Sequence, residues 1–185
     1  MGRPSNRQQK RAEILKAFAR VLSDHGYAGA TIAAIALEAG IAPGLVHHHF
    51  EDKAELLRDL VKDLISRFRQ RVHQYEKDDD PLLAYVDGAL KLDERADLVA
   101  AKCWVGVFSE AVRDPTLFQQ MRTLIDTEIS SIEQRSRGRL GSAEAGSVLA
   151  FIIGALVLGA FAPRKTAGFA APGLRQLIAS FGVGG

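Results

Sequence analysis

Three consecutive histidines, His47, His48 and His49, are the residues of this sequence that most directly suggest metal chemistry. Neighbouring side chains on a helix point about 100° apart, so three in a row cannot converge on one ion. We therefore expect no metal site here. The three imidazoles are better interpreted as separate side chains with different surroundings.

The single cysteine, Cys103, excludes an internal disulfide and a cysteine-based zinc finger. It lies in the apolar run AAKCWVGVF, where a buried structural thiol is favoured over a nucleophile. The sequence contains no Gly-rich phosphate loop, no nucleophile elbow and no HExxH pair. We expect no catalytic residues, no enzyme activity and no cofactor.

The histidines close the stretch TIAAIALEAGIAPGLVHHHF, residues 31–50, which is typical of two short helices joined by a tight turn. Thr31 can cap the first helix, because its hydroxyl can accept a hydrogen bond from an unpaired backbone N–H. Gly40 suits the left-handed end of that helix, and Pro43 suits the first turn of the next one. The pattern predicts a helix-turn-helix, whose second helix enters the DNA major groove.

This stretch resembles the DNA-binding domain of the TetR family, the tetracycline-repressor-type regulators. The residues that carry the resemblance are Thr31, Ile35, Ala36, Ala39, Gly40, Ile41, Gly44, Phe50 and Lys53. The resemblance implies an all-helical homodimer with an N-terminal three-helix DNA-binding domain and a larger ligand-binding and dimerisation domain. Two positions depart from the family pattern: Ala42 stands where a serine or threonine cap is usual, and His47 where a tyrosine is usual.

By this resemblance, His47 takes the place of a phosphate-contacting side chain, and Lys53 would pair with a phosphate at the start of the following helix. His48 would face the groove and meet a base edge or a thymine methyl group, whereas His49 would be partly buried. A basic arm at the N-terminus could reach the minor groove. The expected DNA-binding residues are Arg3, Thr31, Pro43, Gly44, Leu45, His47, His48 and Lys53.

The charge distribution favours the same end of the chain for DNA binding. Residues 1–77 carry 13 basic and 9 acidic side chains, whereas residues 78–185 carry 11 basic and 13 acidic ones. A polyanion would bind the positive end, and the C-terminal part is not suited to one. The N-terminus is polar and lacks the apolar segment of a secretory signal, so we expect a cytoplasmic protein.

Apolar residues at helical spacing predict helices along the whole chain, and strand signals are weak. Gly26 should end the first helix, and Asp80 and Asp114 should cap helices that start with Pro81 and Pro115. The expected helices are residues 7–25, 31–39, 43–50, 51–75, 81–94, 97–113, 115–135, 142–162 and 172–181, with Ser142 as a cap and a loop at 163–172. We place the DNA-binding domain at residues 1–52 and the ligand-binding and dimerisation domain at residues 53–185.

The segment at 142–162 is almost wholly apolar and approaches the ~20 residues of a membrane span. It is rich in glycine and alanine, has no aromatic belt, and lies within an otherwise soluble helical chain, so we expect no membrane insertion. A helix that is apolar on all sides can be buried both by its own domain and by a partner subunit. The expected dimer interface comprises Ile152, Ile153, Leu156, Leu174, Leu177, Ile178 and Phe181.

Residues 95–135 are similar to the BetI-type branch of the TetR family, whose best-known member senses choline compounds. Apolar residues that could flank an effector cavity surround this segment, together with one acid that could supply a counter-charge. The candidates are Tyr85, Trp104, Phe108, Glu110, Met121 and Phe151. The resemblance suggests a quaternary amine or a hydrophobic amphiphile as effector, since Trp104 could offer cation–π attraction and an apolar wall serves either ligand.

The sequence therefore predicts an all-α, ligand-responsive transcriptional regulator. We expect a repressor that binds a palindromic double-stranded operator as a homodimer and is released by a small-molecule effector. Two alternatives stay open at this level: a helical membrane-associated protein built on the apolar segment, and a small-molecule-binding protein without a role on DNA.

Overall fold

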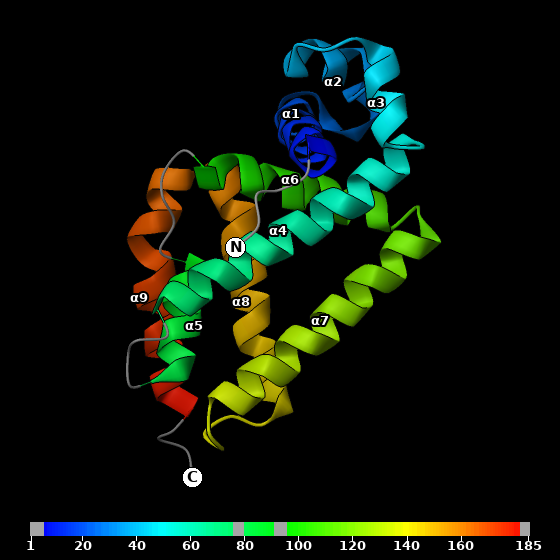
Figure 1. The fold of residues 1–185 in the computed structure, drawn as a ribbon. Helices are drawn as coiled ribbons and strands as arrows, with labels where there is room; N and C mark the ends of the chain where they lie inside the picture. The colour runs from blue at the N-terminus through cyan, green and yellow to red at the C-terminus, as the bar shows by residue number, and fades with distance from the viewer. Residues whose placement is uncertain (1–5, 76–79, 91–95, 182–185) are drawn as a thin grey trace.

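The computed structural model describes residues 6–75, 80–90 and 96–181. All regular structure in these residues is helical (Figure 1). The elements are α1 (Asn6–Gly29), α2 (Ile32–Ala39), α3 (Pro43–His49), α4 (Lys53–Tyr75), α5 (Pro81–Leu90), α6 (Ala96–Ala111), α7 (Pro115–Arg135), α8 (Ser142–Phe161) and α9 (Pro163–Phe181). The predicted all-α class is confirmed.

The first three helices form one end of the molecule, and α2 and α3 make the helix-turn-helix (Figure 1). The Thr31 hydroxyl accepts a hydrogen bond from Ala34 N at 3.1 Å, as predicted for an N-cap. Gly40 ends α2 with φ 65° and ψ 36°, and its N–H and that of Ile41 bond to carbonyls of the last turn. Ala42 offers α3 no side-chain cap. These local interactions fix the corner between the two helices.

Gly26 does interrupt the first helix, but the chain resumes helical structure for a few residues beyond it. Its φ of 68° and ψ of 176° are accessible to glycine and strained for other residues. The change of direction brings residues 27–29 towards the start of α4. The backbone carbonyl of Tyr27 accepts a hydrogen bond from Lys53 there.

One hydrophobic core lies beneath the helix-turn-helix and reaches into the C-terminal part of the chain. Buried residues of α1, α2, α3 and the first half of α4 pack with Cys103, Val107 and Ala111 of α6 and with the start of α7. The Cys103 thiol donates to the Ala19 carbonyl, with 3.3 Å between sulfur and oxygen. Helix α6 is therefore packed directly against α1.

A second core joins α5, α8 and α9 with the end of α4 and the end of α7. Helices α4 and α5 cross where Gly88 meets Val72, because a Cβ atom at Gly88 would lie 2.5 Å from the Val72 Cα. The Arg175 guanidinium binds both oxygens of the buried Asp87 carboxylate, at 3.2 and 2.5 Å, and so ties α9 to α5. This second core supports the helices that surround the cavity described below.

The predicted ends of α2, α3, α4, α6 and α7 agree with the structure to within two residues, whereas α1 continues past the predicted residue 25 to Gly29. The predicted end at residue 94 lies outside the described residues. The cap of α8 and the start of α9 differ from the prediction. Asp80 and Asp114 accept hydrogen bonds from the first N–H groups of α5 and α7. Gly141, not Ser142, is the N-cap of α8, and its N–H donates to the Glu144 carboxylate at 2.9 Å. The predicted loop at residues 163–172 is wrong: α9 starts at Pro163 and continues through Pro172. Burial of Thr166, Ala170 and Ala171 holds this part helical despite its Gly and Pro content.

Candidate DNA-binding surface and effector cavity

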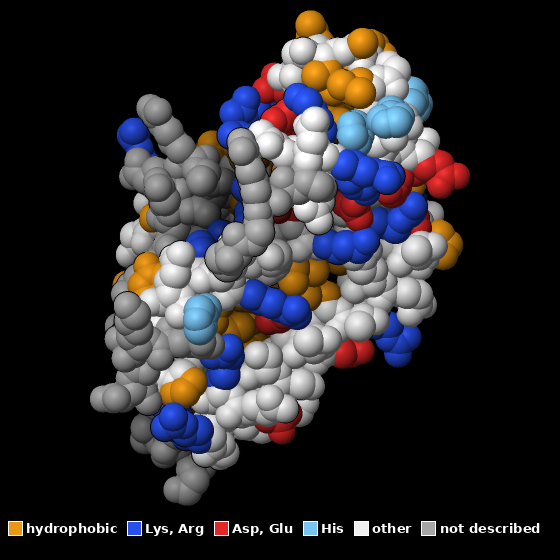
Figure 2. All heavy atoms as spheres, viewed as in Figure 1, with side chains coloured by type: hydrophobic (Ala, Val, Ile, Leu, Met, Phe, Trp, Pro, Cys, Tyr) orange, Lys and Arg blue, Asp and Glu red, His pale blue; other side chains and the backbone are white. Residues whose placement is uncertain are grey.

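The outer face of α3 presents short and polar side chains to solvent. Pro43, Gly44, His47 and His48 are exposed, and Leu45 is half-buried. A Cβ atom at Gly44 would meet nothing within 4 Å, so another molecule could approach the backbone closely at this position. Figure 2 shows His side chains gathered over this end of the molecule, above a band of Lys and Arg side chains. The face is suited to a groove of polyanionic DNA.

His49 lies on the opposite side of α3 and is only 8% exposed. Its ring packs edge-to-face on His48, and its Nδ1 atom has no hydrogen-bond partner. Burial lowers the pKa of His49, and nearby positive side chains, including Arg7 and Arg11, add to the effect. A neutral core imidazole follows from these surroundings. Among the described residues, no group of three His, Cys, Asp or Glu could hold a metal ion.

Two of the predicted DNA contacts have structural roles within the domain. The Lys53 ammonium donates to the Tyr27 carbonyl at 2.8 Å and lies 4.1 Å from the centre of the Tyr27 ring. The Thr31 oxygen is the cap of α2. Lys53 has three N–H donors, so one fixed hydrogen bond orients the ammonium without exhausting its capacity. Arg3 falls outside the described residues, and its role stays a prediction.

Arg11 links α3, the recognition helix of the helix-turn-helix, to α4, and sequence reasoning did not assign this role. Its guanidinium donates to the backbone carbonyl of His49, to Glu55 at 2.8 Å and to Asp59 at 2.5 Å. It also lies 3.9 Å from the centre of the Phe50 ring. The sequence shows Arg11 only as one of several N-terminal basic residues. Its partners lie 38 to 48 positions away along the chain, so no local pattern marks them.

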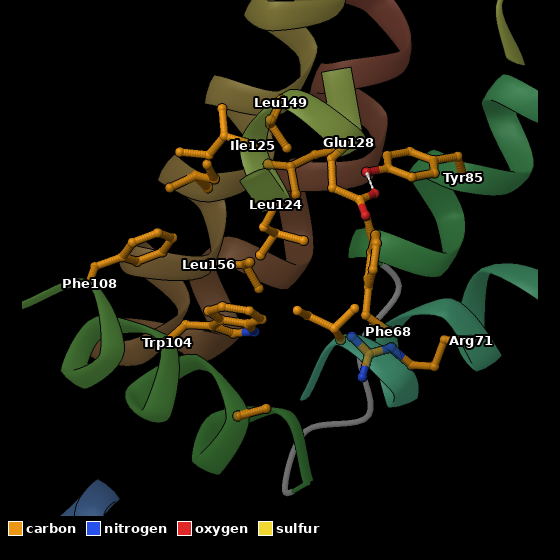
Figure 3. Close-up of a pocket in the computed structure, with 15 residues that line it drawn as sticks. Phe68, Arg71, Tyr85, Trp104, Phe108, Leu124, Ile125, Glu128, Leu149 and Leu156 are labelled. Atoms are coloured by element: carbon orange, nitrogen blue, oxygen red, sulfur yellow. Dashed lines mark hydrogen bonds between the residues drawn. The ribbon is translucent and has the colours of Figure 1, made fainter. Parts of the chain in front are cut away.

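A largely apolar cavity lies among α4, α5, α6, α7 and α8 (Figure 3). Its interior is small, about 70 Å³, whereas typical small-molecule sites have roughly 300–1,000 Å³, so a ligand would have to push the wall side chains apart. Its wall combines two aromatic pairs with aliphatic side chains of α7 and α8. The pairs are Trp104 with Phe108, whose ring centres are 5.8 Å apart, and Phe68 with Tyr85 at 5.5 Å.

Glu128 of α7 is the acid of this cavity and is itself 7% exposed. The Tyr85 hydroxyl donates to its Oε2 at 2.9 Å, and the Arg69 Nη2 lies 3.4 Å from its Oε1. Burial, and then the neighbouring carboxylate, raise the pKa of Tyr85 far above its usual range. The phenol therefore stays protonated and donates a hydrogen bond to Glu128. The carboxylate is already provided with a hydrogen-bond donor and a positive partner.

The structure brings three of the six predicted ligand residues to the cavity: Tyr85, Trp104 and Phe108. Glu110, Met121 and Phe151 do not line it. Met121 is buried in the core below the helix-turn-helix, and Phe151 packs against the second core next to α9, where its Cζ would be 3.6 Å from a Cβ atom at Gly173. Glu110 stands in the last turn of α6. The acid that lines the cavity is instead Glu128 of α7, whose position on the helix turns its side chain towards the cavity.

The predicted interface residues lie mostly inside the protomer. Ile152, Leu174 and Ile178 belong to the second core, and Ile153 and Leu156 line the cavity, because α8 and α9 pack on each other and on α5. Leu177 and Phe181 are partly buried against that core. The apolar side chains that point outward are different ones: Leu158, Phe161 and Phe169, with exposed fractions of 52, 78 and 45%. The interface itself stays a prediction, because nearly every position of α8 is apolar and periodicity alone does not separate its outward side from its inward side.

In the described part of the chain, α8 is the one helix long and apolar enough to cross a membrane, and a third of its apolar window is buried within the protomer. It packs against α6, α7 and α9. Its apolar character therefore serves the second core and the cavity wall. The remaining apolar surface is the outward stripe that contains Leu158 and Phe161.

A helix-turn-helix with an exposed recognition helix, joined by α4 to a helical body that encloses an apolar cavity, defines a DNA-binding transcriptional regulator. The sequence profile of the tetR family of bacterial regulatory proteins matches residues 14–60. The HTH-type transcriptional regulator BetI of Escherichia coli O17:K52:H18 is 32% identical over 160 residues, which cover 80% of each chain. The protein belongs to the TetR family. Its relatives are transcriptional regulators and not enzymes.

Solved structures share this fold across nearly the whole chain. A transcriptional regulator from Rhodococcus sp. RHA1 has a TM-score of 0.81 at 22% identity, covering 92% of this chain and 95% of that one. A regulator from Saccharomonospora viridis, solved in complex with choline, has a TM-score of 0.79 at 20% identity, covering 93% of this chain and 96% of the other.

Proposed function

We propose that the protein is a cytoplasmic repressor that binds a palindromic operator as a homodimer and leaves it when a small-molecule effector fills the cavity. The observation that carries this proposal is the position of α6. Trp104 and Phe108 on one side of this helix line the cavity, whereas Cys103 and Val107 on the other side pack against the core that supports α1. A ligand that pushes on one side of α6 must disturb the contact on the other.

Helix α4 offers a second route from cavity to DNA. Ile65 and Phe68 line the cavity, and the same helix begins at Lys53, next to the recognition helix. Arg11 fastens that beginning to the end of α3. An effector that fits only a tilted arrangement of α4 and α6 would shift the population towards it, by no more than its difference in affinity for the two arrangements. The S. viridis regulator, solved in complex with choline, supports a small-molecule ligand for a protein of this fold.

The division of the chain follows from this mechanism. We place the DNA-binding domain at residues 1–52 and the ligand-binding and dimerisation domain at residues 53–185. The buried side chains of the first half of α4 and of α6 join the core under the helix-turn-helix, so the two domains share a continuous packed interface. Such an interface transmits displacement better than a flexible linker would.

The proposed dimer uses the outer face of α8 and α9. Leu158 and Phe161 expose large apolar surfaces there, and a Cβ atom at Gly154 would meet nothing within 4 Å, which leaves room for a partner helix. Phe161→Arg or Leu158→Arg should give monomers in sedimentation velocity at micromolar concentration. Phe118→Arg is the matched control, because Phe118 is 51% exposed and belongs to α7, not to α8 or α9. Monomeric wild-type protein would refute the proposal.

Selection of binding sites from a pool of random DNA duplexes tests the operator proposal. A homodimer should enrich two inverted half-sites whose centres lie about one helical turn, ~34–36 Å, apart. Pro43, Gly44 and Leu45 provide few hydrogen-bond donors for base edges, so DNA shape should contribute to the preference. Lys53→Gln should weaken binding to all sequences and lower the salt slope by about one unit. A single unpaired half-site in the selected sequences would contradict the homodimer.

The effector role is tested with the operator so obtained. Trp104→Ala should keep operator affinity and lose the response to the effector, since the indole forms the cavity wall and belongs to α6, not to the helix-turn-helix. His48→Ala is the matched control and should show the reverse pattern. If Trp104→Ala still releases DNA at the same effector concentration, the effector binds elsewhere.

A further inference from the structure

A polar groove opens on the surface between α4 and α7, directly beside the apolar cavity. Ile65 and Leu124 line both of them, so the cavity and the groove share a wall. The other residues of the groove are Lys62, Ser66, Arg69, Gln70 and His73 from α4, with Gln119, Gln120, Thr123 and Thr127 from α7. Figure 1 shows α4 and α7 diverging at this place.

The groove is positively charged. None of the described residues that line it is acidic, whereas Lys62 and Arg69 are basic. The Lys62 ammonium also pairs with Asp59, at 2.8 Å, outside the groove. The Arg69 side chain is 58% exposed and makes only a 3.4 Å contact with Glu128. Figure 2 shows orange apolar side chains in the middle of this face, between groups of blue basic ones.

The cavity itself does not favour a cation. Its acid, Glu128, already accepts a hydrogen bond from the Tyr85 hydroxyl, with 2.9 Å between the oxygens, and faces Arg69 at 3.4 Å. Its wall also includes the guanidinium-bearing Arg71, whose Nε donates to the Gly88 carbonyl at 3.3 Å. A quaternary ammonium ion would be attracted by the Trp104 ring but would approach two guanidinium groups.

We propose that the effector is an amphiphile with an acidic head group, whose apolar tail widens the small cavity between the two aromatic pairs as it enters and whose head lies in the α4–α7 groove beside Arg69. This inference rests on the proposed effector role of the cavity. The tail meets the apolar wall formed by Trp104, Leu124 and Leu156. The head meets guanidinium, hydroxyl and amide donors in a place that is open to water, so that its charge is not buried.

The test compares three molecules that share one tail and differ in head charge: decanoate, decanol and decyltrimethylammonium, each below its critical micelle concentration. Trp104 is the single tryptophan of the chain, so its emission reports occupancy of the cavity without a label. We expect decanoate to bind about tenfold more tightly than decanol, and decyltrimethylammonium to bind most weakly. The order needs only the wild-type protein, and therefore does not depend on the stability of any variant.

Variants then locate the head group. Arg69→Gln should weaken decanoate about tenfold and leave decanol unchanged, because only the anion interacts with the guanidinium charge. Arg67→Gln is the matched control: Arg67 is on the same helix, is 60% exposed and pairs with Asp63, but does not line the groove. It should change the affinity for none of the three ligands.

The outcomes separate this inference from the proposed function. Tightest binding of decyltrimethylammonium, or equal affinities for all three, would overturn the acidic head group while leaving the cavity as the effector site. If Arg69→Gln weakened the binding of decanoate and decanol equally, the head group would not lie in the groove. If none of the three changes Trp104 emission up to its solubility limit, both the tail site and the effector role of the cavity are wrong.

Discussion

Replacement of Arg11 by Gln should loosen the joint between the recognition helix and α4. The substitution removes two ion-paired hydrogen bonds, to Glu55 and Asp59, and one hydrogen bond to the His49 carbonyl. The three charged side chains are 20 to 28% exposed, so they are neither fully solvated nor fully buried. Exposed pairs contribute up to about 1 kcal/mol, and breaking a buried pair costs about 3–5 kcal/mol. We expect a loss of about 2 kcal/mol in the free energy of unfolding.

Thermal unfolding at fixed protein concentration measures this loss, which should lower Tm by about 4–8 °C for a chain of this size. Arg20→Gln is the matched control. Arg20 is on the same helix and pairs with Glu38 at 2.8 Å, but its side chain is 54% exposed. It should shift Tm by less than about 2 °C. Operator affinity should also fall in Arg11→Gln, since the guanidinium holds the end of α3 against α4.

The effect of Arg11→Gln should depend on pH in a defined direction. The hydrogen bond from Arg11 lowers the pKa of Glu55 below its usual value. Burial raises the pKa of Asp59, but the hydrogen bonds from Lys62 and Arg11 outweigh burial, so the pKa of Asp59 is also lowered. A carboxyl whose pKa is lower in the folded state stabilises the fold above its unfolded pKa, and this contribution is lost as pH falls through the folded pKa. The Tm difference from wild type should therefore be full at pH 7 and shrink below about pH 4. An effect equal to that of Arg20→Gln, or one that does not change with pH, would refute the reasoning.

Three further predictions concern single buried groups. Arg175→Ala leaves the buried Asp87 carboxylate without its bidentate partner and should cost about 3 kcal/mol in urea unfolding, against under 1 kcal/mol for the exposed Arg20→Ala. Cys103 should react with a thiol reagent at pH 8 only after unfolding, because burial raises its pKa to about 12; rapid labelling of folded protein would contradict this. In wild type, the free energy of unfolding should fall between pH 7 and 5, because a buried neutral imidazole with a lowered pKa destabilises the fold as pH falls below its unfolded pKa of about 6.5. His49→Leu should reduce this fall. An unchanged slope of stability against pH would argue against a buried neutral state.

The sequence by itself determined the helices and the DNA-binding end of the protein. Thr31, Gly40, Asp80 and Asp114 act through hydrogen bonds and dihedral angles within about four residues of their own position, so their roles can be inferred from local spacing. The same holds for the two-helix pattern at residues 31–50, in which capping, turn and apolar spacing agree with one another. Local inference misplaced the cap of α8 and the end of α1, and it failed most at the start of α9, where buried Ala170 and Ala171 maintain a helix through a Gly- and Pro-containing segment.

Only the tertiary structure decided which side of each apolar helix faces the cavity, the core or the outside. In α8 nearly every residue is apolar, so periodicity could not separate Ile153 and Leu156, which line the cavity, from Leu158, which points outward. Likewise, Glu128 and Tyr85 lie 43 residues apart in the chain, and Arg11 and Glu55 lie 44 apart. Such contacts form when helices pack at particular angles and rotations, which depend on the whole set of facing side chains and not on any local run of residues.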